Sequence, residues 1–304
     1  MDLKELHKNI GTAKDNRNNP IHDWYRFTAG FSYKLVQKII ELEGLGDKDC
    51  IYECFAGCGT TLVSAQKNGI PAVGNEGQEL LYNVIKAKLD WSVNINSLKQ
   101  FMLKIELSIE NGTYEKPYHQ LLRTLYTDNN LFQLYYIRDF ISDSKLENNC
   151  KVFLNLALTQ TLHKVSIHPI AIPYISRSKT LRGNLTAYDT FKNTVFKMIE
   201  DLATVDGMSN CTNIYRHDSR KRNEEIETDS CSISITSPPY LNNLDYGEVS
   251  KVCSHFFGYT NDWNEITEKV RKELVTGATT HYKESEFDLE QWKSSDFYIK
   301  NKSV

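Results

Sequence analysis

Short predicted strands and helices alternate in the first third of the chain, and this alternation constrains the fold more than any other feature. A strand begins at Ile51 and runs into a turn containing glycine, and a helix is predicted over about 60–68. A second strand over 71–76 and a second helix over about 80–91 follow. The order strand, helix, strand, helix is typical of a parallel sheet with helices packed on it. We therefore predict an α/β fold.

Long helical stretches without strand alternation follow from about residue 97 to 205, and strands resume only over 212–215 and 231–236. One of these helical stretches is predicted over 121–141 and another over 188–202. The sheet is thus interrupted by a mostly helical insert. Aromatic residues at helical spacing favour a buried core in the insert over a base-stacking surface. They are Tyr118, Tyr126, Phe132, Tyr135, Tyr136 and Phe140.

Two consecutive prolines, Pro238 and Pro239, end the last predicted strand, because proline cannot continue a sheet ladder. The residues around them therefore lie at the carboxyl edge of the sheet, where open α/β sheets bind ligands. The hydroxyl of Ser237, the carbonyl of Pro238 and the ring of Tyr240 then project together. This set suits a flat base with an exocyclic amine, since two oxygens accept its N–H groups and a ring stacks on its face.

A glycine turn follows the first strand and opens a helix. Gly57 and Gly59 let the backbone approach a ligand, and the helix start offers unpaired N–H groups. A dinucleotide-binding turn would have a third glycine where this chain has Leu62, which favours S-adenosylmethionine over NAD.

Three acids stand at the ends of predicted strands. Glu53 is placed to pair with a methionine ammonium, Glu76 to accept hydrogen bonds from ribose hydroxyls, and Asp218 to accept one from an adenine amino group.

These segments together resemble the ordered motifs of the class I S-adenosylmethionine-dependent DNA amino-methyltransferases, which methylate cytosine N4 or adenine N6. Residues 19–32 look like the family's N-terminal cofactor-packing motif, 53–61 like its methionine-binding loop, 218–220 like the Asp-Ser-Arg string, and 236–240 like its Thr-Ser-Pro-Pro-Tyr motif. The family more often has Asp-Pro-Phe where this chain has Glu-Cys-Phe at 53–55. The resemblance covers 19–91 and 212–282 and leaves the insert unmatched.

The resemblance implies a partial Rossmann-like methyltransferase sheet with a defined set of site residues. The implied catalytic residues are Ser237, Pro238, Pro239 and Tyr240. The implied cofactor-binding residues are Phe31, Ser32, Glu53, Phe55, Ala56, Gly57, Gly59, Thr60, Thr61, Glu76 and Asp218. Serine rather than aspartate at position 237 favours cytosine N4 over adenine N6.

Five parts of the chain are predicted on this basis. They are a flexible N-terminal arm (1–20), a cofactor-binding part (21–95), the helical insert as candidate target-recognition region (96–208), a catalytic part (209–282) and a polar C-terminal tail (283–304).

A net charge of −3 does not by itself indicate a nucleic-acid partner, so a DNA enzyme must gather its positive charge on one face. Two basic stretches are available, at 164–182 and 216–222, and solvated loops explain either one equally well. The candidate contacts to double-stranded DNA are Lys164, Arg177, Lys179, Arg182, Arg220, Asn242, Asn243 and Tyr246.

Seven cysteines without paired spacing indicate reduced thiols in a cytoplasmic protein and no metal site. The N-terminus has no apolar signal core, and no apolar run is long enough to span a membrane.

Residues 241–304 show none of the further strands that the resembling family has. We therefore expect a second polypeptide to supply them, as in a split enzyme, with a truncated product as the competing explanation. Three other functions stay open: an RNA base methyltransferase, a non-catalytic DNA-binding or regulatory subunit with the same shell, and, more distantly, a dinucleotide oxidoreductase.

Overall fold

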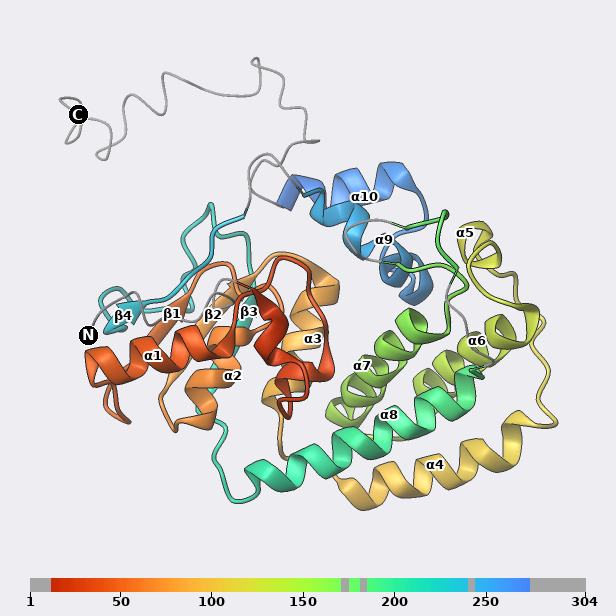
Figure 1. The fold of residues 1–304 in the computed structure, drawn as a ribbon, viewed down its shortest axis with the longest axis horizontal. Coiled ribbons are helices and arrows are strands. Elements are labelled where there is room, and N and C mark those ends of the chain that lie inside the picture. The colour runs from red at the N-terminus through yellow and green to blue at the C-terminus, as the bar shows by residue number, and fades with distance from the viewer. Residues whose placement is uncertain (1–11, 171–174, 181–184, 240–243, 274–304) are drawn as a thin grey trace, which may run out of the picture.

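The computed structural model describes residues 12–170, 175–180, 185–239 and 244–273. Four parallel strands within these residues form one sheet in the order β3-β2-β1-β4 (Figure 1). Ile51 pairs with Ala72 on one side and with Ile233 on the other. The predicted α/β fold with a parallel sheet is confirmed. The strands are β1 Ile51–Glu53, β2 Ala72–Glu76, β3 Thr212–Arg216 and β4 Ile233–Ser234.

The strand predicted over 231–236 is shorter than expected. β4 pairs only with Ile51 and Tyr52 of β1, and β1 itself ends at Glu53, where the chain turns into the glycine loop. The ladder therefore has no partner for residues after Ile235, whose N–H bonds to the Tyr52 carbonyl at 3.0 Å. The proline segment leaves the sheet directly after this point.

One face of the sheet is covered by the helix that precedes β1 and by the helices that follow β1 and β2. These are α1 Tyr33–Glu43, α2 Thr60–Lys67 and α3 Glu79–Leu89. A Cβ on Gly74 of β2 would lie 2.9 Å from Leu62 Cδ1, so glycine allows α2 to pack closely on the strand. This agrees with the predicted alternation of strand and helix.

The opposite face is crossed by the loop 217–232. Asn75 donates a hydrogen bond to the Tyr52 hydroxyl at 3.0 Å, and Asn223 of the loop donates to Asn75 Oδ1 at 2.8 Å. Tyr52 and Tyr215 remain half-buried on this face. The two faces are thus covered to different extents by the residues that the structure describes.

The insert is helical and lies beside the sheet (Figure 1). Its helices are α4 Ile95–Ile109, α5 Gln120–Arg123, α6 Asp128–Asp143, α7 Asn148–Val165 and α8 Ala187–Leu202, followed by the short helix η4 Ala203–Val205. The helical stretch predicted over 121–141 consists of two helices, α5 and α6. α5 ends at Arg123, and α6 begins after Thr127, whose hydroxyl caps it by accepting from Asn130 N at 3.3 Å.

The aromatic residues of the insert form core, as predicted. Tyr126 and Tyr135 are buried, at 3% exposure each. The others pack against the core while partly buried, namely Tyr118, Phe132, Tyr136 and Phe140.

The N-terminal segment joins the insert to the sheet. It contains the short helices η2 Ala13–Asn16 and η3 His22–Trp24. The buried Trp24 donates from Nε1 to Asp201 of α8 at 2.8 Å, and Asn16 bonds to both the Phe31 carbonyl and the Tyr33 N–H. The prediction of a flexible arm was therefore wrong for residues 12–20, which are anchored. Residues 1–11 lie outside the described residues.

Two further helices follow the proline segment: α9 Tyr246–Phe257, which the sequence did not predict, and α10 Trp263–Lys269. A last short helix, η5 Arg271–Glu273, ends the described chain, so the predicted tail (283–304) lies outside it. No helix within the described residues combines the length and apolarity needed to cross a bilayer.

Candidate active site

A cavity of about 850 Å³, which includes space open to solvent, lies where the strands end. Its walls come from four segments that follow β1, β2, β3 and β4, together with residues 27–31 and Tyr246. Gly57 and Pro238, which are far apart in the sequence, both line it. Binding sites of α/β sheets lie at the carboxyl ends of their strands. The cavity is therefore the candidate site.

Two glycines of the turn adopt backbone angles at which any other residue would be strained. Gly57 has a φ of +56°, and a Cβ there would lie 3.3 Å from Phe27 Cε1. Gly59, with a φ of +81°, precedes the first residue of α2, and its N–H bonds to the Ala56 carbonyl at 2.7 Å. Phe55, Ala56 and Thr60 line the cavity beside Gly57. The turn brings backbone, rather than side chains, close to the space a ligand would fill.

Glu76 joins the end of β2 to this turn. It is 7% exposed and lines the cavity. Its Oε2 accepts from Gly57 N and its Oε1 from Gln78 N, both at 2.9 Å. Burial raises the pKa of Glu76 to about 7, against the lowering effect of these two hydrogen bonds. Each carboxylate oxygen has a further lone pair, so Glu76 has room to accept hydrogen bonds from a ligand.

Glu53 lies beneath the glycine turn and not in the cavity wall, where its place at the end of β1 predicts it. It is 1% exposed and does not belong to the cavity lining. Its Oε2 accepts from the Thr61 hydroxyl at 2.7 Å and its Oε1 from Phe55 N at 3.3 Å. Burial raises the pKa of Glu53 to about 7, although hydrogen bonds lower it. Glu53 and Thr61 thus hold the turn from beneath.

Three other predicted cofactor residues also lie outside the lining, namely Thr61, Gly59 and Ser32. Gly59 packs against Ile85 of α3, which a Cβ would approach to 3.1 Å. Ser32 is fully buried, caps α1 by accepting from Lys34 N at 3.2 Å, and donates to Asp15 Oδ2 at 2.9 Å. Its neighbour Phe31 does line the cavity. Ser32 therefore places Phe31 by fixing the start of the helix.

The proline segment forms another wall of the cavity, next to the glycine turn. Ser237, Pro238 and Pro239 line the cavity, with Ser237 half-buried and Pro238 exposed. Just before them, Thr236 Oγ1 accepts from Cys54 Sγ at 3.5 Å, which links the two walls. Three predicted residues lie outside the described residues, namely Tyr240, Asn242 and Asn243.

Tyr246, predicted as a DNA contact, lines the same cavity. Its ring lies 6.3 Å from that of Phe27, measured between centroids, in a tilted arrangement. The cavity wall formed by the proline segment therefore also includes the first residue of α9.

Asp218 and Arg220 form an ion pair beside the cavity. Asp218 lines it, and Arg220 binds both oxygens of its carboxylate at 2.8 and 2.7 Å. Burial acts to raise the pKa of Asp218, but the hydrogen bonds and charge of Arg220 outweigh it and lower the pKa. Arg220 also donates to the Lys272 carbonyl. Its guanidinium, predicted to contact DNA, is engaged within the protein.

The predicted phosphate contacts of the insert are exposed where the structure describes them. Lys164 donates to Thr194 Oγ1 at 3.1 Å, and Arg177 to Thr124 Oγ1 at 3.4 Å. Lys179 is exposed, and Arg182 lies outside the described residues. Their role in binding DNA stays a prediction.

Gln78 is a cavity residue that the sequence analysis missed. It is 2% exposed, and its amide donates to Ser250 Oγ at 2.8 Å and to the Tyr246 carbonyl at 3.3 Å. The only signal available was its place two residues after Glu76. Among the described residues, no three His, Cys, Asp or Glu side chains are grouped so as to hold a metal ion.

Two curated proteins are similar to this chain. The Type II methyltransferase M.BsoBI of Geobacillus stearothermophilus is 23% identical over 340 positions, covering 98% of this chain and 62% of that protein. The Type II methyltransferase M.MvaI of Kocuria varians is 21% identical over 301 positions, covering 91% and 66%. The chain thus spans less than two thirds of the length of the relatives it matches. No family model matches it, and neither does any solved structure. The parallel sheet and its helices are consistent with the Rossmann-like methyltransferase fold that the sequence predicts.

Proposed function

We propose that this chain is a subunit of a site-specific DNA methyltransferase that uses S-adenosylmethionine to methylate the exocyclic amine of an extruded base, with cytosine N4 favoured over adenine N6. One observation carries the proposal: the glycine turn at Gly57 and the proline segment at Pro238 line one cavity. The similarity to two Type II methyltransferases supports the reaction class. A methyl donor at one wall and a base at the other would meet there.

The residues of the first wall suit S-adenosylmethionine. The absence of a side chain at Gly57 leaves a cradle that a Cβ would fill. Glu76 would accept hydrogen bonds from the ribose hydroxyls, and the Asp218 carboxylate would accept one from the adenine amino group. When bound, the cofactor supplies a methyl group on a sulfonium, and the carbon–sulfur bond breaks with its electron pair going to sulfur as the amine nitrogen bonds the methyl carbon.

The residues of the second wall would prepare the amine. Its lone pair is delocalised into the base, so it is a poor nucleophile until its geometry changes. Ser237 Oγ and the Pro238 carbonyl would accept its two N–H groups and direct the lone pair at the methyl group. The proton released from nitrogen would pass to solvent. Because the donor is already activated, positioning and electrostatics supply most of the acceleration.

We also propose that a second polypeptide completes the sheet next to β4. The support is the place of β4, which is the last strand of the described sheet and pairs there only with β1. The face bearing Tyr52 and Tyr215, which the loop 217–232 leaves half-exposed, offers further surface to a partner. The experiment is to purify the tagged chain after co-expression with its gene neighbours and to measure the size of the complex. A chain that is monomeric, soluble and fully active by itself would overturn this part of the proposal.

Methyl transfer from labelled S-adenosylmethionine tests the main proposal. The protein, with any co-purifying partner, is incubated with unmodified genomic DNA or with cellular RNA, and the nucleosides are identified by mass spectrometry. We expect N4-methylcytosine in DNA. N6-methyladenine would reassign the base, and transfer to RNA alone would favour the RNA enzyme. Cofactor binding by calorimetry without transfer would favour a non-catalytic shell.

A further inference from the structure

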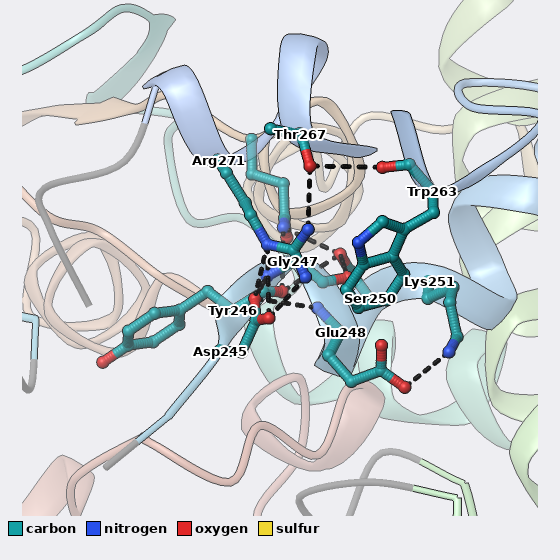
Figure 2. A network of polar contacts seen from close by, with 10 residues as sticks. Asp245, Tyr246, Gly247, Glu248, Ser250, Lys251, Trp263, Thr267 and Arg271 are labelled. Atoms are coloured by element: carbon teal, nitrogen blue, oxygen red, sulfur yellow. Dashed lines mark hydrogen bonds and ion pairs between the residues drawn. The ribbon is translucent and has the colours of Figure 1, made fainter. Parts of the chain in front are cut away.

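A buried ion pair lies just beyond the proline segment (Figure 2). Arg271 of η5 binds the Asp245 carboxylate through Nε at 3.2 Å to each oxygen and through Nη2 at 2.5 Å to Oδ2. The side chains are only 7% and 6% exposed. Trp263 covers the guanidinium, whose carbon lies 4.0 Å from the ring centroid, and Thr267 accepts from Nη1 at 2.9 Å. The arginine is therefore held in one orientation from three sides.

Asp245 is also the N-cap of α9. Its Oδ1 accepts from Gly247 N at 3.0 Å and from Glu248 N at 3.2 Å, so one carboxylate satisfies both the helix start and the arginine. A Cβ on Gly247 would lie 2.9 Å from Ile266 Cγ2 and 3.3 Å from Arg271 Cγ. Glycine is needed here for η5 and α10 to pack this closely on α9.

The other side of the α9 start is held by the cofactor wall. Gln78 bonds to the Tyr246 carbonyl and to Ser250, and the Tyr246 ring packs near Phe27 inside the cavity. The start of α9 is thus fixed between the cavity and η5. Asp245 and Arg271 hold it on the side away from the cavity. Asp245 lies one residue before Tyr246 and eight residues after Ser237.

A buried ion pair is a poor device for stability alone, because well-packed apolar residues of similar size often do as well. Its advantage is directional, since an arginine fork and a carboxylate fix each other's orientation. We propose that Asp245 and Arg271 are positioning residues that set the place of Tyr246, and so the geometry of the cavity wall that Tyr246 forms together with the proline segment. This inference rests on the proposed methyl-transfer function.

Replacing both partners by apolar residues separates positioning from stability. The double variant Asp245→Leu/Arg271→Met removes both charges together and so avoids the unpaired charge that either single change would leave. We expect a folded protein whose affinity for S-adenosylmethionine, by calorimetry, stays within about twofold of the wild type. We expect kcat for DNA methylation to fall by about 10- to 100-fold, the range that a small misplacement of reacting groups produces. Arg271→Lys should fall in between, because one ammonium cannot reproduce the fork.

A matched control is the exposed ion pair of Glu268 and Lys272, 2.6 Å apart on the same segment. The double variant Glu268→Gln/Lys272→Met should retain wild-type kcat. A folded Asp245→Leu/Arg271→Met protein with wild-type kcat would overturn the inference. If that variant does not fold, Arg271→Lys decides, and a folded Arg271→Lys protein with undiminished kcat overturns it equally. Failure of the proposed function is distinct, because the wild-type protein itself would then transfer no methyl group.

Discussion

The two walls of the cavity are built in different ways. The first wall, which we propose binds the cofactor, is the glycine turn. Its backbone N–H groups donate hydrogen bonds to two buried carboxylates, from Gly57 to Glu76 and from Phe55 to Glu53. The second wall, which we propose faces the base, is the proline segment, in which Pro238 is exposed and Ser237 half-buried. Hydrogen bonds hold the chain on either side of it, from Cys54 to Thr236 and from Arg271 to Asp245. The first wall is therefore complete within its own strand ends, whereas the second depends on helices that lie further along the chain. Changes at the two walls should have separable effects, on cofactor affinity and on turnover respectively.

Ser237→Ala should give the largest effect and should act on turnover alone. Removing one of two acceptors on the reacting amine is expected to lower kcat by about 10²- to 10³-fold, as loss of one group that stabilises a transition state does. Affinity for S-adenosylmethionine should not change. The measurement is methyl transfer at saturating cofactor, with calorimetry beside it. Ser234→Ala, an exposed serine of β4, is the matched control and should behave as wild type.

Gly57→Ala should act on the first wall. A non-glycine residue at a φ of +56° costs roughly 1–2 kcal/mol. The new Cβ would also press on Phe27. This strain lowers the melting temperature directly. A turn that shifts to relieve it moves away from the cofactor, so we expect affinity for S-adenosylmethionine to fall by up to about 5- to 30-fold, the factor that this energy corresponds to. Gly46→Ala, where no atom lies within 4 Å of the added Cβ, should change neither quantity. A normal affinity in Gly57→Ala would show that the turn does not approach the cofactor.

Sequence analysis identified most parts of the fold and of the cavity, for a physical reason. Strand ends, glycine turns and proline pairs are local signals, so the sheet and both walls could be located from residues such as Gly57 and Pro238. The partners of a side chain depend on tertiary packing, which no local pattern records. The Glu53 hydrogen bond to Thr61, the engagement of Arg220 by Asp218 and the role of Gln78 were therefore not foreseen. α9 was missed because its start depends on Asp245 and Arg271, which are 26 residues apart.

The pH dependence of cofactor binding should report on Glu76. Its pKa of about 7 means that the cofactor-free protein carries a proton there below neutrality. Hydroxyl donors from a ribose stabilise the ionised form, so binding should release that proton and tighten as the pH rises from 6 to 8. The change should be at most about tenfold for one group. Calorimetry in buffers of different ionisation enthalpy measures both affinity and proton release. Glu76→Gln should bind more weakly with a flat profile, and a wild-type profile that is also flat would contradict the assignment.

Glu53→Gln is the finest test, because two interpretations of Glu53 differ. If Glu53 pairs directly with the methionine ammonium, as its sequence position suggests, losing its charge should weaken cofactor binding tenfold or more. If it supports the turn from beneath, glutamine can still accept from Thr61 or Phe55, and affinity should stay within about threefold. The second outcome agrees with its place outside the cavity lining.

The pH dependence of stability supplies a further test of Glu53. A folded-state pKa near 7, above the value of about 4.5 in the unfolded chain, means that the folded protein holds a proton which the unfolded chain has released. This contribution is present below pH 4.5 and is lost as the pH rises to 7, so the melting temperature of Glu53→Gln should depend less on pH across this window than that of the wild type.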